Sequence, residues 1–291
     1  MSRTVFLPET LPELQELMGR HPDAVLYAGG TDILVQLRAG TITPPALICL
    51  ERVTALRFIR EQENHLMIGA CTRFTDILEC SPVAVHLPLL CKAVRALGSP
   101  LIRHAATIGG NICTASPAGD TLPALTLLDA VLELHTSEGA RRVPLHEFIR
   151  GPGRTACRPG EILTAIEIPK PDGFNIHHFE KVGQRNALAI SIASFAALLR
   201  LSDSGVIENA RLAWGSVGPT VVTSKSAENA LIGNRLNHDV LSHAAVIAQA
   251  AVSPIDDIRA GAAYRRQVSG NLVRRLSDYK PPAAMDARRI S

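Results

Sequence analysis

The first fifty residues alternate between helix-like and strand-like spacing of their apolar positions. Thr10 and Glu13 form a capping box, and apolar residues then recur at helical spacing up to about residue 20. Residues 1–52 are therefore predicted to form a first sub-domain in the order helix, strand, helix, strand. The strands are expected at 24–27 and 46–50, and the second helix, capped by Thr31, runs to about residue 37.

A proline- and glycine-rich turn at 169–173 is the strongest break in the chain. Before it, residues 53–173 mix short strands and helices in a second sub-domain. After it, residues 174–291 are predicted to form a C-terminal domain, in which a long β-hairpin precedes two helices. The predicted class is α+β. The expected strands are 56–60, 66–70, 130–135, 141–144, 161–168, 190–201 and 206–217, and the expected helices are 74–78, 87–97, 122–128, 236–251 and 259–279.

Composition narrows the possible functions. The 291 residues carry a net charge of only +3 and 4% aromatic residues, which gives no basis for a nucleic-acid partner. The N-terminus lacks the pattern of a secretory signal, and no apolar run is long enough to span a bilayer. The sequence therefore predicts a cytoplasmic protein with no membrane span.

Catalytic and metal-binding patterns are missing from the sequence. The six cysteines form no CxxC pair and have no zinc or iron–sulfur spacing, so we expect reduced thiols, with Cys113 as a small filler. His177 and His178 have no third ligand at a recognisable spacing. No nucleophile elbow or HExxH motif is present, and no carboxylate pair can be placed about a scissile bond. We therefore predict no catalytic side chain and no metal site in this chain.

Two glycine segments carry the candidate chemistry. Residues 26–34 contain Gly29-Gly30-Thr31, and residues 107–120 contain Gly109-Gly110-Asn111. Glycines let a backbone approach an anion and adopt positive φ, and successive amides can then donate to phosphate oxygens. Two such segments could hold one diphosphate from two sides without a lysine.

Neither segment is a GxGxxG fingerprint or a GxxxxGK[ST] loop, which excludes a simple Rossmann or P-loop site. A single Gly-Gly turn is equally typical of close packing without a ligand. The pairing of two turns, with Ser116 and Asp120 near the second, favours a nucleotide site.

These motifs resemble the flavin subunits of the molybdenum hydroxylases, such as xanthine dehydrogenase and carbon monoxide dehydrogenase. The resemblance rests on the two glycine segments with Ala115-Ser116-Pro117 and Asp120, and it covers nearly the whole chain. It implies a two-part α/β FAD-binding domain, like that of vanillyl-alcohol oxidase, followed by a C-terminal domain of antiparallel sheet and helices. It continues through Glu161-Ile162-Leu163, Ile166-Glu167-Ile168-Pro169, Phe179-Glu180-Lys181, Gly215-Ser216-Val217-Gly218-Pro219-Thr220, Asp257-Ile258-Arg259 and Tyr264-Arg265-Arg266.

The resemblance also implies roles for single residues. The first segment would contact the FAD diphosphate through its amides, the second would form the opposing wall, and Asp120 would accept a hydrogen bond from a sugar or ribityl hydroxyl. The leucines would pack on the cofactor, and Lys181 would lie near the flavin. The implied cofactor-binding residues are Leu26, Tyr27, Ala28, Gly29, Gly30, Thr31, Asp32, Ile33, Leu97, Thr107, Gly110, Asn111, Asp120, Leu163 and Lys181.

Simpler interpretations of these residues stay open. Asp120 could cap a helix that starts at Thr121. Leu97 and Leu163 are also typical core residues. Lys181 could be solvated at a strand edge.

The resemblance implies partners as well. A small iron–sulfur subunit and a large molybdopterin subunit would complete a heterotrimer, with the iron–sulfur clusters and molybdopterin bound only there. FAD in this chain would pass electrons to an acceptor such as NAD, although residues 184–190 lack the acidic residues of some NAD-linked relatives. The alternatives are a stand-alone flavin reductase of related fold and a nucleotide-binding assembly subunit without redox activity.

Overall fold

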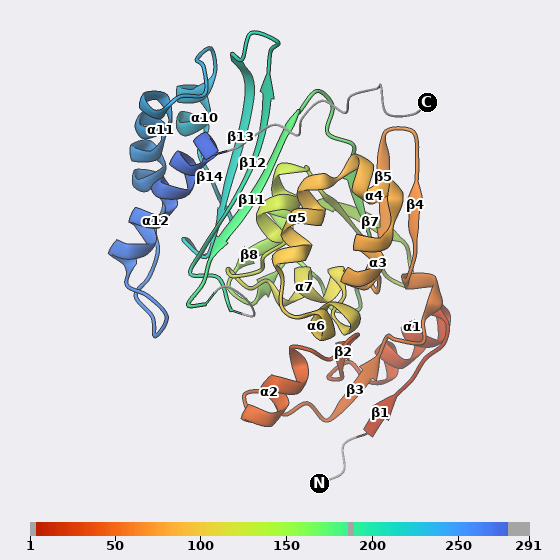
Figure 1. Ribbon diagram of the computed structural model, residues 1–291. Helices are drawn as coiled ribbons and strands as arrows, with labels where there is room; N and C mark the ends of the chain where they lie inside the picture. Colours follow the sequence, from red (N-terminus) through yellow and green to blue (C-terminus); the bar gives the residue numbers. More distant parts are fainter. Residues whose placement is uncertain (1–3, 186–188, 279–291) are drawn as a thin grey trace.

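The computed structural model describes residues 4–185 and 189–278. Its strands form three main sheets, which follow one another along the chain, and a two-stranded ribbon. In Figure 1 the first sheet lies at one end of the molecule, the second in the middle, and the third beside it with a layer of helices outside. The α+β class predicted from the sequence is confirmed. No helix among these residues has the length and apolar character needed to cross a membrane.

The first sheet is small and parallel. Its order is β1-β3-β2, and both outer strands run parallel to β3. Leu14 of α1 and Ile48 of β3 are fully buried where the helix packs on the sheet. Thr10 caps α1 as predicted, by accepting from the Glu13 amide, but Glu13 reaches back to the amide of Glu9. The elements are β1 (Thr4–Phe6), α1 (Leu11–Arg20), β2 (Val25–Tyr27), α2 (Ile33–Ala39) and β3 (Ala46–Cys49).

The second sheet is antiparallel, in the order β4-β5-β10-β6-β7. Short helices cover it, and their apolar side chains and those of its strands build the largest apolar core. A register shift in β10 falls between Leu163 and Ala165, both buried. The elements are η1 (Thr54–Leu56), β4 (Ile59–Glu61), β5 (His65–Gly69), α3 (Phe74–Glu79), α4 (Ser81–His86), α5 (Pro88–Ala96), α6 (Pro100–Ala105), α7 (Ile108–Thr114), α8 (Leu122–Leu127), β6 (Val131–His135), β7 (Ala140–Pro144), α9 (Leu145–Phe148), β8 (Ile149–Gly151), β9 (Arg154–Thr155) and β10 (Ile162–Pro169).

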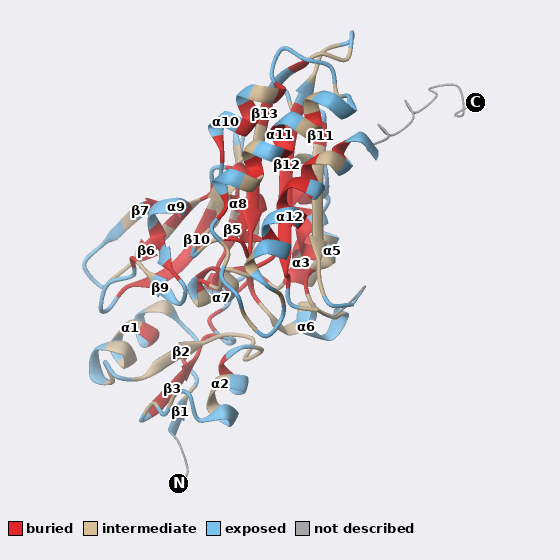
Figure 2. Ribbon diagram, turned by 90° about the vertical axis from the view of Figure 1, so that its left-hand side faces the viewer, coloured by how far each residue is buried: buried red, intermediate tan, exposed pale blue. Residues whose placement is uncertain are grey.

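The third sheet has the order β11-β12-β13-β14, and its strand β12 is buried on both faces, as Figure 2 shows. Along β12, Ala196 and Leu198 join the core of the middle sheet, while Phe195 and Leu199 join a separate core under the outer helices. This alternation explains the continuous apolar run, since side chains point to opposite faces in turn. The elements are β11 (Ile176–Val182), β12 (Ala193–Leu201), β13 (Ile207–Gly215), β14 (Val222–Thr223), α10 (Lys225–Leu231), α11 (His238–Ala251), α12 (Ala262–Arg274) and η2 (Arg275–Asp278).

Several predicted boundaries are wrong. Residues 190–192 lie outside β12, because Ser191 and Ile192 turn toward the middle sub-domain and α12. The last helix starts at Ala262 instead of 259, because Asp257 organises a turn there; Tyr279 lies outside the described residues. The two domain boundaries predicted after 52 and 173 stay predictions.

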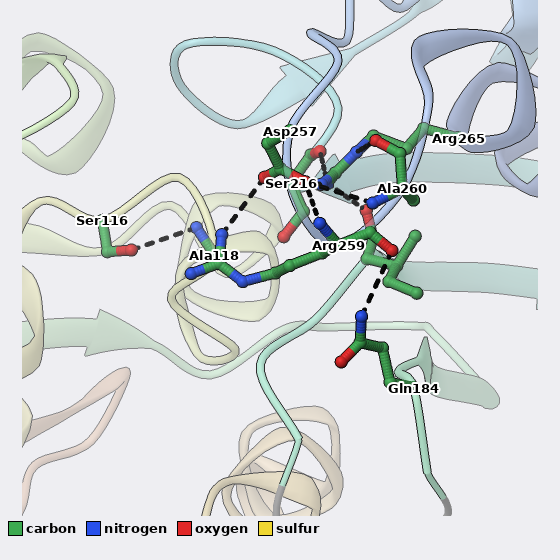
Figure 3. A network of polar contacts seen from close by, with 9 residues as sticks. Ser116, Ala118, Gln184, Ser216, Asp257, Arg259, Ala260 and Arg265 are labelled. Atoms are coloured by element: carbon green, nitrogen blue, oxygen red, sulfur yellow. Dashed lines mark hydrogen bonds and ion pairs between the residues drawn. The ribbon is translucent and has the colours of Figure 1, made fainter.

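The turn before α12 is built around one carboxylate (Figure 3). Asp257 accepts from the amides of Arg259 and Ala260 at 2.8 and 3.2 Å, and from the Arg265 guanidinium at 2.6 Å. The two amides and Arg265 lower the pKa of Asp257 to about 2, with the Arg259 amide contributing most. The ionised carboxylate is therefore the form that holds the turn.

Replacing Asp257 by Asn should destabilise the chain near neutral pH and matter less in acid. A carboxyl whose folded-state pKa is lowered contributes stability above its unfolded pKa, and this is lost as the pH falls toward about 2. Thermal unfolding of both chains from pH 7 to pH 3 measures the difference. A gap in Tm that stays constant over this range would contradict the assignment.

Candidate FAD site between the glycine segments

A cavity of about 620 Å³ lies where the first sheet meets α6 and α7. Its size is typical of cofactor sites, which measure about 300–1,000 Å³. Among the described residues, no Lys or Arg side chain lines it. The lining residues are Val25, Leu26, Tyr27, Ala28, Gly29, Gly30, Thr31, Asp32, Ile33, Gln36, Ile42, Phe74, Leu97, Gly98, Ile102, Ala106, Thr107, Gly110, Asn111, Cys113, Thr114, Ser116, Ala118, Gly119, Asp120, Ala189 and Ile190.

The first glycine segment leaves a run of amides free. Gly30 has φ of 70°, a conformation that glycine adopts without strain, and it connects β2 to α2. In the described part of the chain, the N–H groups of residues 29–33 donate to no protein acceptor. Successive unpaired amides at a helix start form an anion-binding nest. Thr31 is not the helix cap that the sequence predicts, because α2 begins two residues later at Ile33.

The second glycine segment is different, because it forms the first turn of α7. Thr107 caps this helix by accepting from the Gly110 amide at 3.2 Å. The Gly109 amide donates to Ala70, and a Cβ on Gly109 would lie 2.6 Å from the Ala70 Cβ. The expectation that both segments present free amides is therefore wrong for the second, whose glycine packs α7 against the end of β5.

Helix α7 contributes polar side chains to the cavity wall. Asn111 accepts from the Thr121 hydroxyl at 2.5 Å, which leaves its amide NH₂ group without an acceptor among the described residues. Thr114 donates to the Gly110 carbonyl within the helix. Asn111 can therefore donate to a ligand oxygen in the cavity.

The two glycine segments lie against each other although they are far apart in the sequence. A Cβ on Gly29 would lie 1.7 Å from the carbonyl oxygen of Ala105, so only glycine allows this approach. The Asp32 carboxylate accepts from Gln36 at 2.6 Å and from the Thr114 hydroxyl at 3.3 Å. Asp32 thereby joins α2 to α7, and its charge is directed to these two donors.

Asp120 sits in a buried polar cluster at the cavity wall. Its carboxylate accepts from the Lys181 ammonium and from the Ser191 hydroxyl, both at 2.6 Å. Burial raises the pKa of Asp120, and Lys181 and Ser191 act against this increase. Asp120 does not cap α8, whose cap position is Thr121, so the capping alternative is wrong.

Two predicted residues do not line the cavity. Leu163 is buried in the core of the middle sheet. Lys181 lies on the edge strand β11, but its side chain is only 13% exposed and bonds to Asp120 and to the Ala189 carbonyl. A solvated Lys181 is therefore wrong, and the contact of both residues with FAD stays a prediction. Leu97 does line the cavity.

Other lining residues escaped the sequence analysis. Gln36 stands four residues after Asp32 on α2, a spacing from which it could have been found. Ala189 and Ile190 come from the C-terminal unit, and no local pattern marks them. Cys113 is exposed in the cavity wall, not the filler predicted.

The cavity fits an anionic cofactor that is held without cations. Its free amides form a continuous run at residues 29–33, and its two carboxylates already have donors from the protein. A diphosphate would satisfy the amides, which are otherwise unpaired polar groups. Among the described residues, no group of three or more His, Cys, Asp or Glu is arranged to hold a metal.

Comparison with known proteins identifies the family. Residues 1–171 match the family described as FAD binding domain in molybdopterin dehydrogenase, and residues 178–279 match the CO dehydrogenase flavoprotein C-terminal domain. The chain belongs to the FAD-binding subunits of the molybdenum hydroxylases. The cofactor of this flavoprotein subunit is therefore FAD, and the complexes of this family are oxidoreductases.

Curated relatives match over nearly the full length. The chain is 32% identical to the nicotinate dehydrogenase FAD-subunit of Eubacterium barkeri, over 93% of each chain. It is 33% identical to the xanthine dehydrogenase FAD-binding subunit of Escherichia coli O157:H7, over 94% of each. The fold matches a chain of the reconstituted CO dehydrogenase from Oligotropha carboxidovorans with a TM-score of 0.89 and 30% identity, covering 94% of this chain and 96% of that one.

Replacing Gly29 by Ala should weaken FAD binding roughly ten-fold or more, since a lost hydrogen bond to a charged group costs about 1.5–3 kcal/mol. The added methyl would push the free amides away from Ala105. Gly19 in α1 has open space around it, so Gly19→Ala is the matched control. Titration of the apo-chain with FAD measures both, and equal dissociation constants would contradict this role of Gly29.

Proposed function

We propose that the amides of residues 29–33 bind the diphosphate of FAD, with Thr107, Gly110 and Asn111 on the opposite side. The observation that carries this proposal is the run of amides without protein acceptors, in a cavity that no Lys or Arg lines among the described residues. Each charged oxygen would gain donors whose direction the fold already fixes.

Asp120 is proposed to accept a hydrogen bond from a sugar or ribityl hydroxyl. Its carboxylate lines the cavity, and each oxygen accepts one protein donor, so further lone pairs are available. Leu97, which also lines the cavity, is proposed to supply an apolar surface for the cofactor. Lys181 would then act on FAD indirectly, by holding Asp120 in place.

In the complete enzyme, this chain is proposed to accept electrons from an iron–sulfur subunit, beside a large molybdopterin subunit. Relatives are named as an FAD-subunit of nicotinate dehydrogenase and a medium chain of carbon monoxide dehydrogenase, and these names support an assembly of several chains. Bound FAD supplies redox chemistry in steps of one or two electrons, and the residues of this chain bind and orient it.

The final acceptor is proposed to be an external molecule such as NAD. Residues 186–188, within the segment considered for NAD use, lie outside the described residues. A stand-alone reductase would need its own acid or base. The two carboxylates of the described cavity lining are engaged by Gln36, Thr114, Lys181 and Ser191, which gives this alternative less support.

If the diphosphate is the recognised group, ADP should compete with FAD for the apo-chain, and AMP should be at least roughly ten-fold weaker. The lost β-phosphate removes the acceptors for part of the amide run. Competition titrations followed by flavin fluorescence measure both nucleotides. If AMP and ADP competed equally, the amides of residues 29–33 would not be recognising the diphosphate, and the proposed binding mode would be refuted.

If NAD is the acceptor, NADH should bleach the visible absorption of the FAD-loaded chain, because hydride transfer between NAD and a flavin is reversible. Stopped-flow spectra without oxygen measure this, and dithionite is the control that the flavin is reducible. Bleaching by dithionite alone would exclude NAD and leave another acceptor.

A further inference from the structure

Residues 189–192, named the wall segment, bring the C-terminal unit to the FAD cavity. Ala189 and Ile190 line the cavity, while Ser191 and Ile192 are buried behind it. The FAD-binding family match ends at residue 171, so these residues belong to the other match. The wall segment can form a fixed side of the cofactor site only if contacts with the rest of the chain hold it in place.

The front of the wall segment is tied to the middle sub-domain. The Ser191 hydroxyl donates to Asp120 at 2.6 Å, and Lys181 donates to both Asp120 and the Ala189 carbonyl. These contacts connect the wall segment to a carboxylate that itself lines the cavity.

The back of the wall segment is tied to α12 by one buried guanidinium. Arg265, which is 4% exposed, donates to the Ile192 carbonyl at 2.7 Å and to the Ser216 carbonyl at 3.0 Å through the same nitrogen. Figure 3 shows this guanidinium with Asp257, Ser216 and the turn before α12. Its other terminal nitrogen pairs with Asp257 at 2.6 Å.

Ser216 continues the connection to a second wall of the cavity. Its amide donates to the Pro117 carbonyl at 2.8 Å, and the neighbours of Pro117 on both sides, Ser116 and Ala118, line the cavity. Ser216 itself has φ of 64°, an unfavourable conformation for a serine that its surroundings must maintain. A single arginine thus holds two segments of cavity lining at once.

We propose that Arg265 is a positioning residue for the FAD site: it fixes the wall segment and the Ser116–Ala118 turn, and the C-terminal unit thereby contributes to FAD affinity. This inference rests on the proposed binding of FAD in this cavity. Burying an ion pair contributes little net stability to a fold. A role in positioning therefore explains better than stabilisation why the Arg265 guanidinium donates to two carbonyls.

The test uses Arg265→Lys in the full-length chain. Lysine keeps the charge that faces Asp257, but a single ammonium lacks the fork that reaches both carbonyls and the carboxylate. The expected result is roughly 5- to 10-fold weaker FAD binding, since a wall that must be ordered on binding costs affinity. Arg266→Lys is the matched control, because Arg266 is the exposed neighbour on the same helix.

A second comparison separates positioning from general stability. Val268→Ala removes a buried side chain from the same helix and should lower Tm without changing FAD affinity. Ser191→Ala loosens the front of the wall segment, so its effect on FAD affinity should not add to that of Arg265→Lys. Independent sites would add within about two-fold.

The outcomes are distinct. FAD titration, visible circular dichroism of the bound flavin and Tm are measured for each variant. Equal FAD affinity of Arg265→Lys and Arg266→Lys would overturn the inference, as would equal weakening by Val268→Ala at the same loss of Tm, or strict additivity with Ser191→Ala. A wild-type chain that binds no FAD would instead overturn the proposed function itself.

Discussion

The proposed FAD site depends on a run of backbone amides that the fold leaves without protein acceptors among the described residues. Residues 29–33 leave β2 with Gly30 in a left-handed conformation, and Gly29 packs so tightly on Ala105 that no side chain fits. Unpaired amides cost free energy unless water or a ligand pairs them. The small parallel sheet and α6 therefore hold these donors in place, and a diphosphate would satisfy several of them together. FAD, the cofactor of this family, carries that group.

Elements with local signals could be predicted from the sequence. The Thr10 cap and the apolar spacing after it define α1, and the apolar run of β12 marks a strand buried on both faces. The second glycine segment shows the limit. Gly109-Gly110 resembles Gly29-Gly30 in the sequence. In the structure, however, Gly109 lies in the first turn of α7, where its amide donates to Ala70 and its backbone packs against that residue. Only this long-range contact distinguishes an anion-binding turn from a packed helix start.

The parts of the candidate site that lie within one sequence motif could be predicted from the sequence. The parts where side chains from distant segments meet could not. Residues 26–33 of the first glycine segment line the cavity, and so do Thr107, Asn111 and Asp120. Leu163 and Lys181 do not, because the first fills the core and the second is occupied by Asp120. The partners of Asp120 come from positions 61 and 71 residues away. No periodicity or motif in a single sequence encodes such a meeting, which arises only when Lys181 of β11 and Ser191 of the wall segment reach Asp120 in the folded chain.

The position of Lys181 changes how the site can act on charge. A lysine near the flavin suggests a full positive charge, but this ammonium lies 2.6 Å from the Asp120 carboxylate and also donates to the Ala189 carbonyl. Its charge is largely compensated locally, and among the described residues no Lys or Arg side chain lines the cavity. The positive potential must then come from amide dipoles, whose effect falls off within a turn and depends strongly on orientation. A cation on a flexible side chain can follow a displaced anion, but a backbone amide cannot. A site of this kind therefore needs rigid walls, which is the physical reason that contacts as remote as those of Arg265 matter for it.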